Sequence, residues 1–271
     1  ITTGTLAATK DVTFSGGLST VDVTLTIDAT DLVGTAVETH VITTGSGADT
    51  VTFTGDSTYV GVAGATGTVA ITTNAGDDII SFTFGDLLAN TTNQAFTIDA
   101  GEGADTITKV GTNGAGATAW TSFVVAAGDS TEAAYDTITG FDLGDGTEYA
   151  DGFNFDGTAA IGSLSTSVDF GSILSHAITA GVASFDDAAN YSAAVVVNSS
   201  NLSDVLGYIM ANTATNDVIA FTYDSDSSGT ADSTFVYHNG TIDSLVLLAG
   251  TTSVDALITT AGTGANDLFI A

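Results

Sequence analysis

A repeated pattern of strand, glycine-containing turn, aspartate and strand occupies the first part of this chain. It appears as VITTGSGADTVTF over residues 41–53, AITTNAGDDIISF over 70–82 and TIDAGEGADTITK over 97–109. The aligned aspartates Asp49, Asp78 and Asp105 are 29 and 27 residues apart. Self-similarity at such a period is typical of stacked coils, each of which buries its apolar face on its neighbours. The repeat therefore predicts a mostly β fold, either a β-solenoid or β-roll-like stack or a pair of sandwich sheets.

Two looser copies extend the pattern towards the C-terminus. One is AAYDTITGFDLG, with Asp136 at the aligned position, and the other is GTGANDLFIA, with Asp267. The repeat becomes weak after residue 160, where helical and strand patterns begin to mix. We therefore divide the chain into a glycine- and aspartate-rich β domain, residues 1–160, and a C-terminal α+β module, residues 161–271.

The turns of the repeat are unusually acidic. Glycine supplies the positive φ angles that tight turns require, and each aspartate is placed so that its carboxylate can reach the turn of the next coil. Ca²⁺ binds six to eight oxygens from carboxylates and backbone carbonyls, which such turns provide. The pattern predicts Ca²⁺ between neighbouring turns, and the alternative is an ordinary turn in which aspartate bonds to nearby backbone. The candidate ligands are Asp49, Asp77, Asp78, Asp99, Glu102 and Asp105.

The charge balance restricts the possible partners. The chain has 32 acidic residues against two basic ones, Lys10 and Lys109, and its formal net charge is −30. Three explanations are open: a solvated acidic surface, adaptation to high salt, or many bound divalent cations. Such a charge argues against nucleic acid and anionic membranes as partners. Cysteine is absent, which excludes disulfides and thiolate metal sites. No apolar run is long enough to span a membrane, and no N-terminal signal peptide is visible.

A second acidic segment follows the repeats. Residues 136–156, DTITGFDLGDGTEYADGFNFD, place Asp142, Asp145, Glu148 and Asp151 at three-residue intervals. The glycines between them argue against a helix. Asp142 and Asp145 are candidate Ca²⁺ ligands, and a solvated loop is the alternative.

The C-terminal third has mixed periodicity. Segments 168–185 and 199–213 are predicted as amphipathic helices, the second capped by Ser200 or Asn201. Its predicted apolar face comprises Leu202, Val205, Leu206, Ile209 and Met210. Three strands are expected near 218–223, 233–238 and 242–248. A two-residue hairpin turn is expected at Asn239–Gly240 between the last two strands.

The loop between the first two of these strands has calcium-site spacing. In DSDSSGTAD, residues 224–232, the polar side chains and the glycine match positions 1, 3, 5, 6 and 9 of an EF-hand loop. These residues are Asp224, Asp226, Ser228, Gly229 and Asp232. Position 12, where an EF-hand has glutamate, is Phe235, so the loop is not an EF-hand. The spacing favours a calcium site of modest affinity over a plain polar loop.

The order of these features resembles the C-terminal regions of type I-secreted, RTX-like bacterial surface proteins, especially S-layer proteins. The resemblance covers about residues 41–271 and includes the glycine–aspartate repeats, YDTITGFDLGDG, DSDSSGTAD and the terminal DLFIA. It implies export through an uncleaved C-terminal signal, folding with Ca²⁺ outside the cell, and assembly with copies of itself into a surface lattice.

The chain is thus expected to be a structural, non-enzymatic subunit of an extracellular layer on a bacterial cell surface. Its expected partners are further copies of itself and cell-surface polysaccharide. The alternative is an RTX-type adhesin module, or the secretion and folding domain of a larger protein. His40, His176 and His238 are far apart in the sequence and lack metal-ligand spacing, and no nucleophile elbow or P-loop is present.

Overall fold

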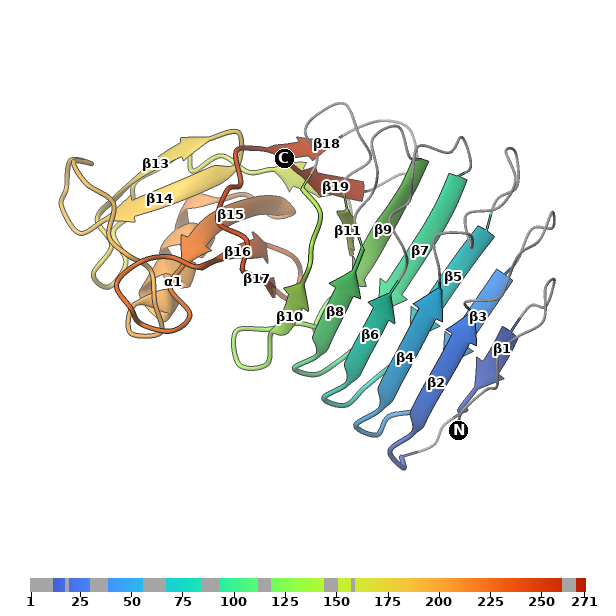
Figure 1. The fold of residues 1–271 in the computed structure, drawn as a ribbon. Coiled ribbons are helices and arrows are strands. Elements are labelled where there is room, and N and C mark those ends of the chain that lie inside the picture. Colours follow the sequence, from blue (N-terminus) through green and yellow to red (C-terminus); the bar gives the residue numbers. More distant parts are fainter. Residues whose placement is uncertain are drawn as a thin grey trace.

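The computed structural model describes residues 12–17, 20–29, 39–55, 67–83, 93–111, 118–143, 151–156, 159–259 and 267–271. In these residues the chain forms two β-sheets that face each other across a common core, and one α-helix. The N-terminal part is a β-solenoid, in which successive coils contribute one strand to each sheet (Figure 1). The predicted solenoid is therefore confirmed.

The first sheet has eight strands. Its first six strands, from β1 to β11 in spatial order, pair in parallel. β19 then pairs antiparallel with β11, and β18 pairs antiparallel with β19. In order across the sheet they are β1 (Val12–Ser15), β3 (Thr39–Thr43), β5 (Gly67–Thr72), β7 (Asn93–Asp99), β9 (Thr118–Val125), β11 (Gly152–Phe155), β19 (Asp267–Ile270) and β18 (Leu257–Thr259).

The second sheet has eleven strands and contains both solenoid strands and strands of the C-terminal module. Its main path runs β13 (Ser175–Thr179), β14 (Val182–Asp186), β15 (Asp217–Tyr223), β16 (Ser233–His238), β17 (Ser244–Ala249), β10 (Asp136–Thr139), β8 (Thr106–Val110), β6 (Ile79–Thr83), β4 (Thr50–Gly55) and β2 (Thr24–Ala29). The short β12 (Ala160–Ile161) pairs with β15.

Equivalent residues of successive coils stack in columns inside the solenoid. Ile42, Ile71 and Ile98 are register partners in the first sheet. In the second sheet, Val51, Ile80, Ile107 and Ile138 form a similar column. All of these side chains are buried, and each fully buried aliphatic side chain contributes about 1.5–3 kcal/mol of transfer free energy. The alternation of buried and outward-facing residues along each strand fixes this register.

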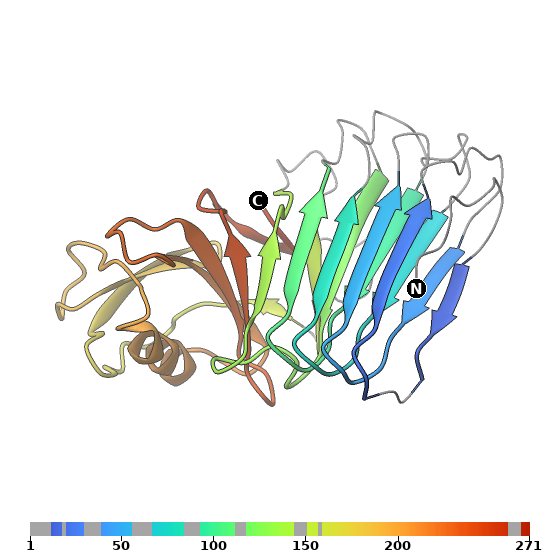
Figure 2. The same ribbon diagram turned by 60° about the horizontal axis from the view of Figure 1, so that its bottom comes forward.

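The C-terminal module continues the solenoid rather than standing apart from it. β17 pairs with the last solenoid strand β10, and β19 pairs with β11, so both sheets cross residue 160. All six residues of β16 are buried, because one face of the sheet packs into the solenoid core and the other packs under α1 (Leu202–Asn212). In Figure 2, α1 lies beneath the strands of the module.

The prediction of a helix over residues 168–185 is wrong. This segment contains the antiparallel hairpin of β13 and β14, with Thr179 paired to Val182. Its two-residue turn is Ala180–Gly181, and both residues have positive φ, 47° and 81°. This is the turn geometry that matches the twist of a hairpin, and Gly181 lowers its cost. The alternation in SHAIT and VASFD therefore prevails over the weaker helical period.

The helix expected over 199–213 is confirmed as α1, the one helix of the described residues, but two of its details differ. Met210 is 52% exposed, and Tyr208 is buried instead. The Tyr208 hydroxyl lies 2.8 Å from Nδ1 of His176 on β13. Asn201 is the N-cap residue, yet its Oδ1 accepts from the backbone N–H of Asn198 and not from the first helical turn.

The three-strand meander is confirmed, but its second turn is not a two-residue turn. β16 ends at His238 and β17 begins at Ser244, which leaves five residues in the connection. The side chain of Asn239 donates to Thr213 Oγ1 and to the Ala214 carbonyl at the end of α1. This tether holds Asn239 beside the helix and so prevents the tight Asn–Gly turn.

Close stacking of the coils predicts a strong effect of adding one methyl group at Gly101. Its φ is +87°, and a Cβ there would overlap the Asn74 carbonyl oxygen of the preceding coil. Gly250 has a similar φ of +77°, but a Cβ added there would have no atom within 4 Å, so it is the matched control. We expect Gly101→Ala to lower the free energy of unfolding by about 3 kcal/mol or more, and Gly250→Ala by about 1 kcal/mol. If urea unfolding shows the same loss of free energy of unfolding for both variants, the coils do not stack this closely.

Candidate metal centre

The loop 224–232 joins β15 to β16 and gathers three predicted ligands. Asp224, Asp226 and Asp232 each place one carboxylate oxygen so that these atoms lie within 4.8 Å of one another. Among the described residues it is the one place where three acidic, histidine or cysteine side chains meet in this way. The two ends of the loop are fixed, since Asp224 N–H donates to the Val197 carbonyl and Asp232 N–H to the Tyr223 carbonyl.

Backbone N–H groups orient these carboxylates. Asp224, which is buried, accepts from Ser228 N–H at 3.0 Å and from Gly229 N–H at 2.8 Å. Asp226 accepts from Ser228 N–H at 3.0 Å. Asp232 accepts from the N–H and the hydroxyl of Ser225, and these hydrogen bonds lower the pKa of Asp232.

The donor set of this loop fits Ca²⁺ in part. Three carboxylates offer hard oxygen ligands, and the oxygens keep further lone pairs beyond those used by the N–H donors. Phe235, at the EF-hand glutamate position, is fully buried in β16 and cannot contribute. The Ser228 hydroxyl donates to the Thr230 carbonyl at 3.3 Å. A bound ion would therefore take its remaining ligands from water, which is consistent with modest affinity.

The aspartates of the repeat form a ladder inside the turns. Asp49, Asp78, Asp105 and Asp136 are all buried, and they stack one above another in successive coils. The carboxylate of Asp78 accepts from the backbone N–H of Asp49 at 2.6 Å, Asp105 accepts from Asp78 at 2.7 Å, and Asp136 from Asp105 at 3.1 Å. Each carboxylate thus satisfies the backbone of the preceding coil. We call these four residues the aspartate ladder.

The ladder leaves one oxygen buried without a hydrogen-bond partner in two of its rungs, Asp78 Oδ2 and Asp105 Oδ2. Burial is the main cause that raises the pKa of Asp78, Asp105 and Asp136, and the neighbouring carboxylates raise it further. The pKa rises to about 7 for Asp105 and to about 9 for Asp136. Asp105 and Asp136 therefore bind protons at pH values where ordinary aspartates are ionised. Whether Ca²⁺ also binds between these turns stays a prediction.

The other repeat acids lie outside the ladder. Asp77 is exposed and accepts from the Ala104 N–H of the next coil at 3.0 Å, and Glu102 is exposed on the same turn. Asp99 ends β7 and is half-buried, and both burial and the charge of Asp129 raise its pKa. The turns thus carry an inner row of hydrogen-bonded aspartates and an outer set of exposed acids.

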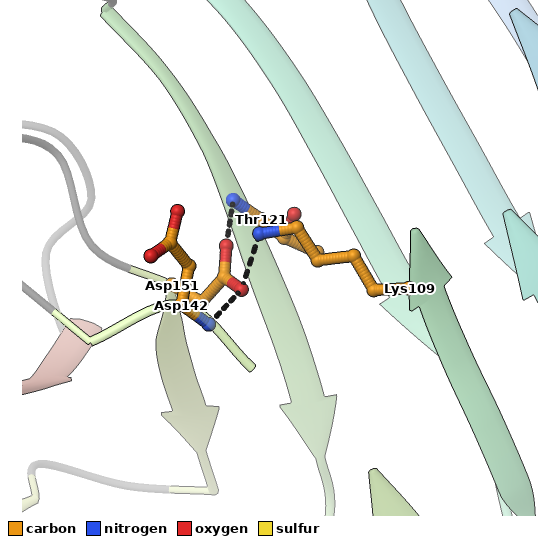
Figure 3. A network of polar contacts seen from close by, with 4 residues as sticks. All are labelled: Lys109, Thr121, Asp142 and Asp151. Atoms are coloured by element: carbon orange, nitrogen blue, oxygen red, sulfur yellow. Dashed lines mark hydrogen bonds and ion pairs between the residues drawn. The ribbon is translucent and has the colours of Figure 1, made fainter. Parts of the chain in front are cut away.

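The structure describes part of the second acidic segment, and the calcium site expected there stays a prediction. Asp142 lies beside Asp151, its N–H donating to Asp151 Oδ2 at 2.9 Å, and Asp145 lies outside the described residues. Asp151 is fully buried and pairs with Lys109, at 2.5 Å between Nζ and Oδ2. Its Oδ1 accepts from Thr121 N–H at 3.3 Å (Figure 3). Burial raises the pKa of Asp151, and the Lys109 charge opposes that rise.

The alternation of residues along the strand, rather than the composition, indicates that Lys109 is buried. Lys109 is the register partner of Phe82, which is itself the partner of Phe53. In TITKV, Ile107 and Lys109 therefore point to the same, buried face. Strand alternation thus places the lysine in the core, where an acidic partner is required.

No protein-family model, curated protein or solved structure matches the chain.

The raised pKa values predict that the fold loses stability as pH rises. Asp105 and Asp136 bind protons more tightly in the folded chain than in the unfolded chain, whose aspartates have a pKa near 3.8. Their contribution to stability is therefore fully present below about pH 4 and is lost as pH rises towards 7 and 9. Asp136→Asn keeps an oxygen for the Asp105 N–H and cannot ionise. In EDTA at pH 9, we expect this variant to melt about 2–4 °C or more above the wild type, with the difference shrinking as pH falls and vanishing only below about pH 4.

The control for this measurement is Asp187→Asn, which removes one charge from an exposed residue far from the ladder. It should leave the slope of melting temperature against pH unchanged. If Asp136→Asn also gives a curve parallel to that of the wild type, the ladder does not hold protons in this range.

Proposed function

We propose that the chain is a structural subunit of a calcium-dependent, self-assembling surface layer, exported by type I secretion and assembled outside a bacterial cell. The observation that carries the proposal is the carboxylate cluster of loop 224–232, held on a rigid strand pair in a chain of net charge −30. Bound Ca²⁺ would reduce the repulsion between copies and allow acidic surfaces to approach each other.

The solenoid suits a structural role. Its coils stack in one direction with the same strand order and register, so stiffness accumulates along the axis. Head-to-tail contacts between such units need not close into a ring, and contacts that do not close generate filaments or sheets. The resemblance to RTX-like surface proteins points in the same direction.

No helix in the described part of the chain is both long enough and apolar enough to cross a membrane.

The proposal predicts that Ca²⁺ drives ordered association and that loop 224–232 contributes to it. The wild-type chain in EDTA should be dispersed, and millimolar Ca²⁺ should produce ordered sheets or filaments in electron microscopy. Asp226→Asn removes an exposed carboxylate without disturbing buried Asp224, and it should raise the Ca²⁺ concentration at half-maximal light scattering by about tenfold. Asp187→Asn is the charge-matched control and should assemble as the wild type does.

Two outcomes would contradict the proposal. A chain that stays monomeric at high concentration in millimolar Ca²⁺ would favour the adhesin or secretion-domain alternative. Equal association in molar KCl without Ca²⁺ would show that general screening is sufficient and that the chain is adapted to high salt.

A further inference from the structure

The pair of Lys109 and Asp151 bridges the two sheets in the middle of the core. Lys109 lies on β8 of the second sheet, and Asp151 directly precedes β11 of the first sheet. Both side chains have zero exposure. The 2.5 Å between Nζ and Oδ2 is shorter than the usual ammonium–carboxylate hydrogen bond of about 2.7–2.9 Å. This ion pair places Nζ beside the carboxyl group whose Cγ it would attack.

The pair belongs to a buried, largely apolar core. Phe141 and Phe153, close in sequence to Asp142 and Asp151, stack with ring centroids 5.3 Å apart. Phe123, two residues after Thr121, stacks on Phe141 at 5.7 Å and is tilted against Phe153 at 6.0 Å. In such a medium two separate charges are costly, whereas a neutral amine and a neutral carboxylic acid are not. Transfer of one proton from Lys109 to Asp151 relieves that cost and leaves the amine nucleophilic.

We propose that Lys109 and Asp151 form an intramolecular isopeptide bond. The Nζ lone pair adds to Cγ of the protonated Asp151 side chain, a second Nζ proton moves to Oδ2, and the Cγ–Oδ2 bond breaks to release water. An ammonium and a carboxylate thus become one secondary amide and one water molecule. No oxidant, reductant or further reactant takes part, so the folded chain contains everything that the reaction needs.

The hydrogen bonds around Asp151 favour this addition. Thr121 N–H donates to Oδ1, the oxygen on which negative charge develops when nitrogen adds to Cγ (Figure 3). Asp142 N–H donates to Oδ2, the oxygen that leaves, and holds the carboxyl group in place. Both donors are backbone groups of ordered strands or turns, so the geometry exists before the reaction begins.

The bond would supply the covalent cross-link that a cysteine-free chain otherwise lacks. It would join the two sheets where the solenoid meets the C-terminal module, and it would close a ring containing residues 110–150. That ring includes β9, β10 and Asp142. A surface protein would gain a link that reducing agents do not break.

Two measurements on the wild-type chain test the proposal. The intact mass of the purified, denatured protein should be lower than the sequence mass by one water molecule. A lysine-specific protease should cut after Lys10 but not after Lys109, because an acylated lysine is not recognised. Digestion should therefore leave residues 11–271 as one fragment, and peptide mapping should find a branched peptide that contains residues 109 and 151.

Variants separate this bond from another dehydration at the same aspartate. Asp151 precedes Gly152, and such a sequence can lose water as a succinimide without any lysine. Lys109→Arg should have the mass calculated from its own sequence. Lys10→Arg should still be lighter than its calculated mass by one water molecule. A wild-type chain of full mass that is cut after Lys109 would overturn the proposal, as would a loss of water that persists in Lys109→Arg.

Discussion

The hydrogen bond from an aspartate N–H of one coil to the aspartate carboxylate of the next is the interaction on which the solenoid depends. In a solenoid turn, some backbone N–H groups have no partner on a neighbouring strand. Leaving such a group buried and unpaired costs about 1–3 kcal/mol. The aspartate ladder provides these acceptors at 2.6–3.1 Å in successive coils. It also fixes how each turn stacks on the next, and thereby aligns the columns of Ile and Phe between the sheets.

The ladder separates two uses of acidic residues that composition cannot distinguish. Inside the turns, carboxylates act as backbone acceptors and keep protons because burial and like charges raise their pKa. On the outside, Asp77 and Asp226 are exposed and Asp232 is half-buried, so their carboxylates lie where a cation can reach them. Burial therefore distinguishes the inner acids, which serve the backbone, from the outer acids, which form the acidic surface.

Much of the fold could be predicted from the sequence because its signals are local and repeated. The aligned aspartates indicated the solenoid, and the alternation in β15 and β16 indicated the meander. The hairpin of β13 and β14 was missed because its turn, Ala180–Gly181, lacks the usual Asn–Gly signature. The Asp224–Asp226–Asp232 cluster followed from spacing within one loop. The Lys109–Asp151 pair could not be found that way, since its partners are 42 residues apart and meet across two sheets.

Amide hydrogen exchange measured by NMR tests the central role of the ladder most directly. The N–H groups of Asp49, Asp78 and Asp105 donate to buried carboxylates. Those of Ala48 and Ala104 donate instead to the exposed carboxylates of Asp22 and Asp77. We predict that the three aspartate amides exchange only with global unfolding, and that the two alanine amides exchange much faster through local opening. Equal and rapid exchange of both groups would contradict the account, because the turns would then be held by the strands alone.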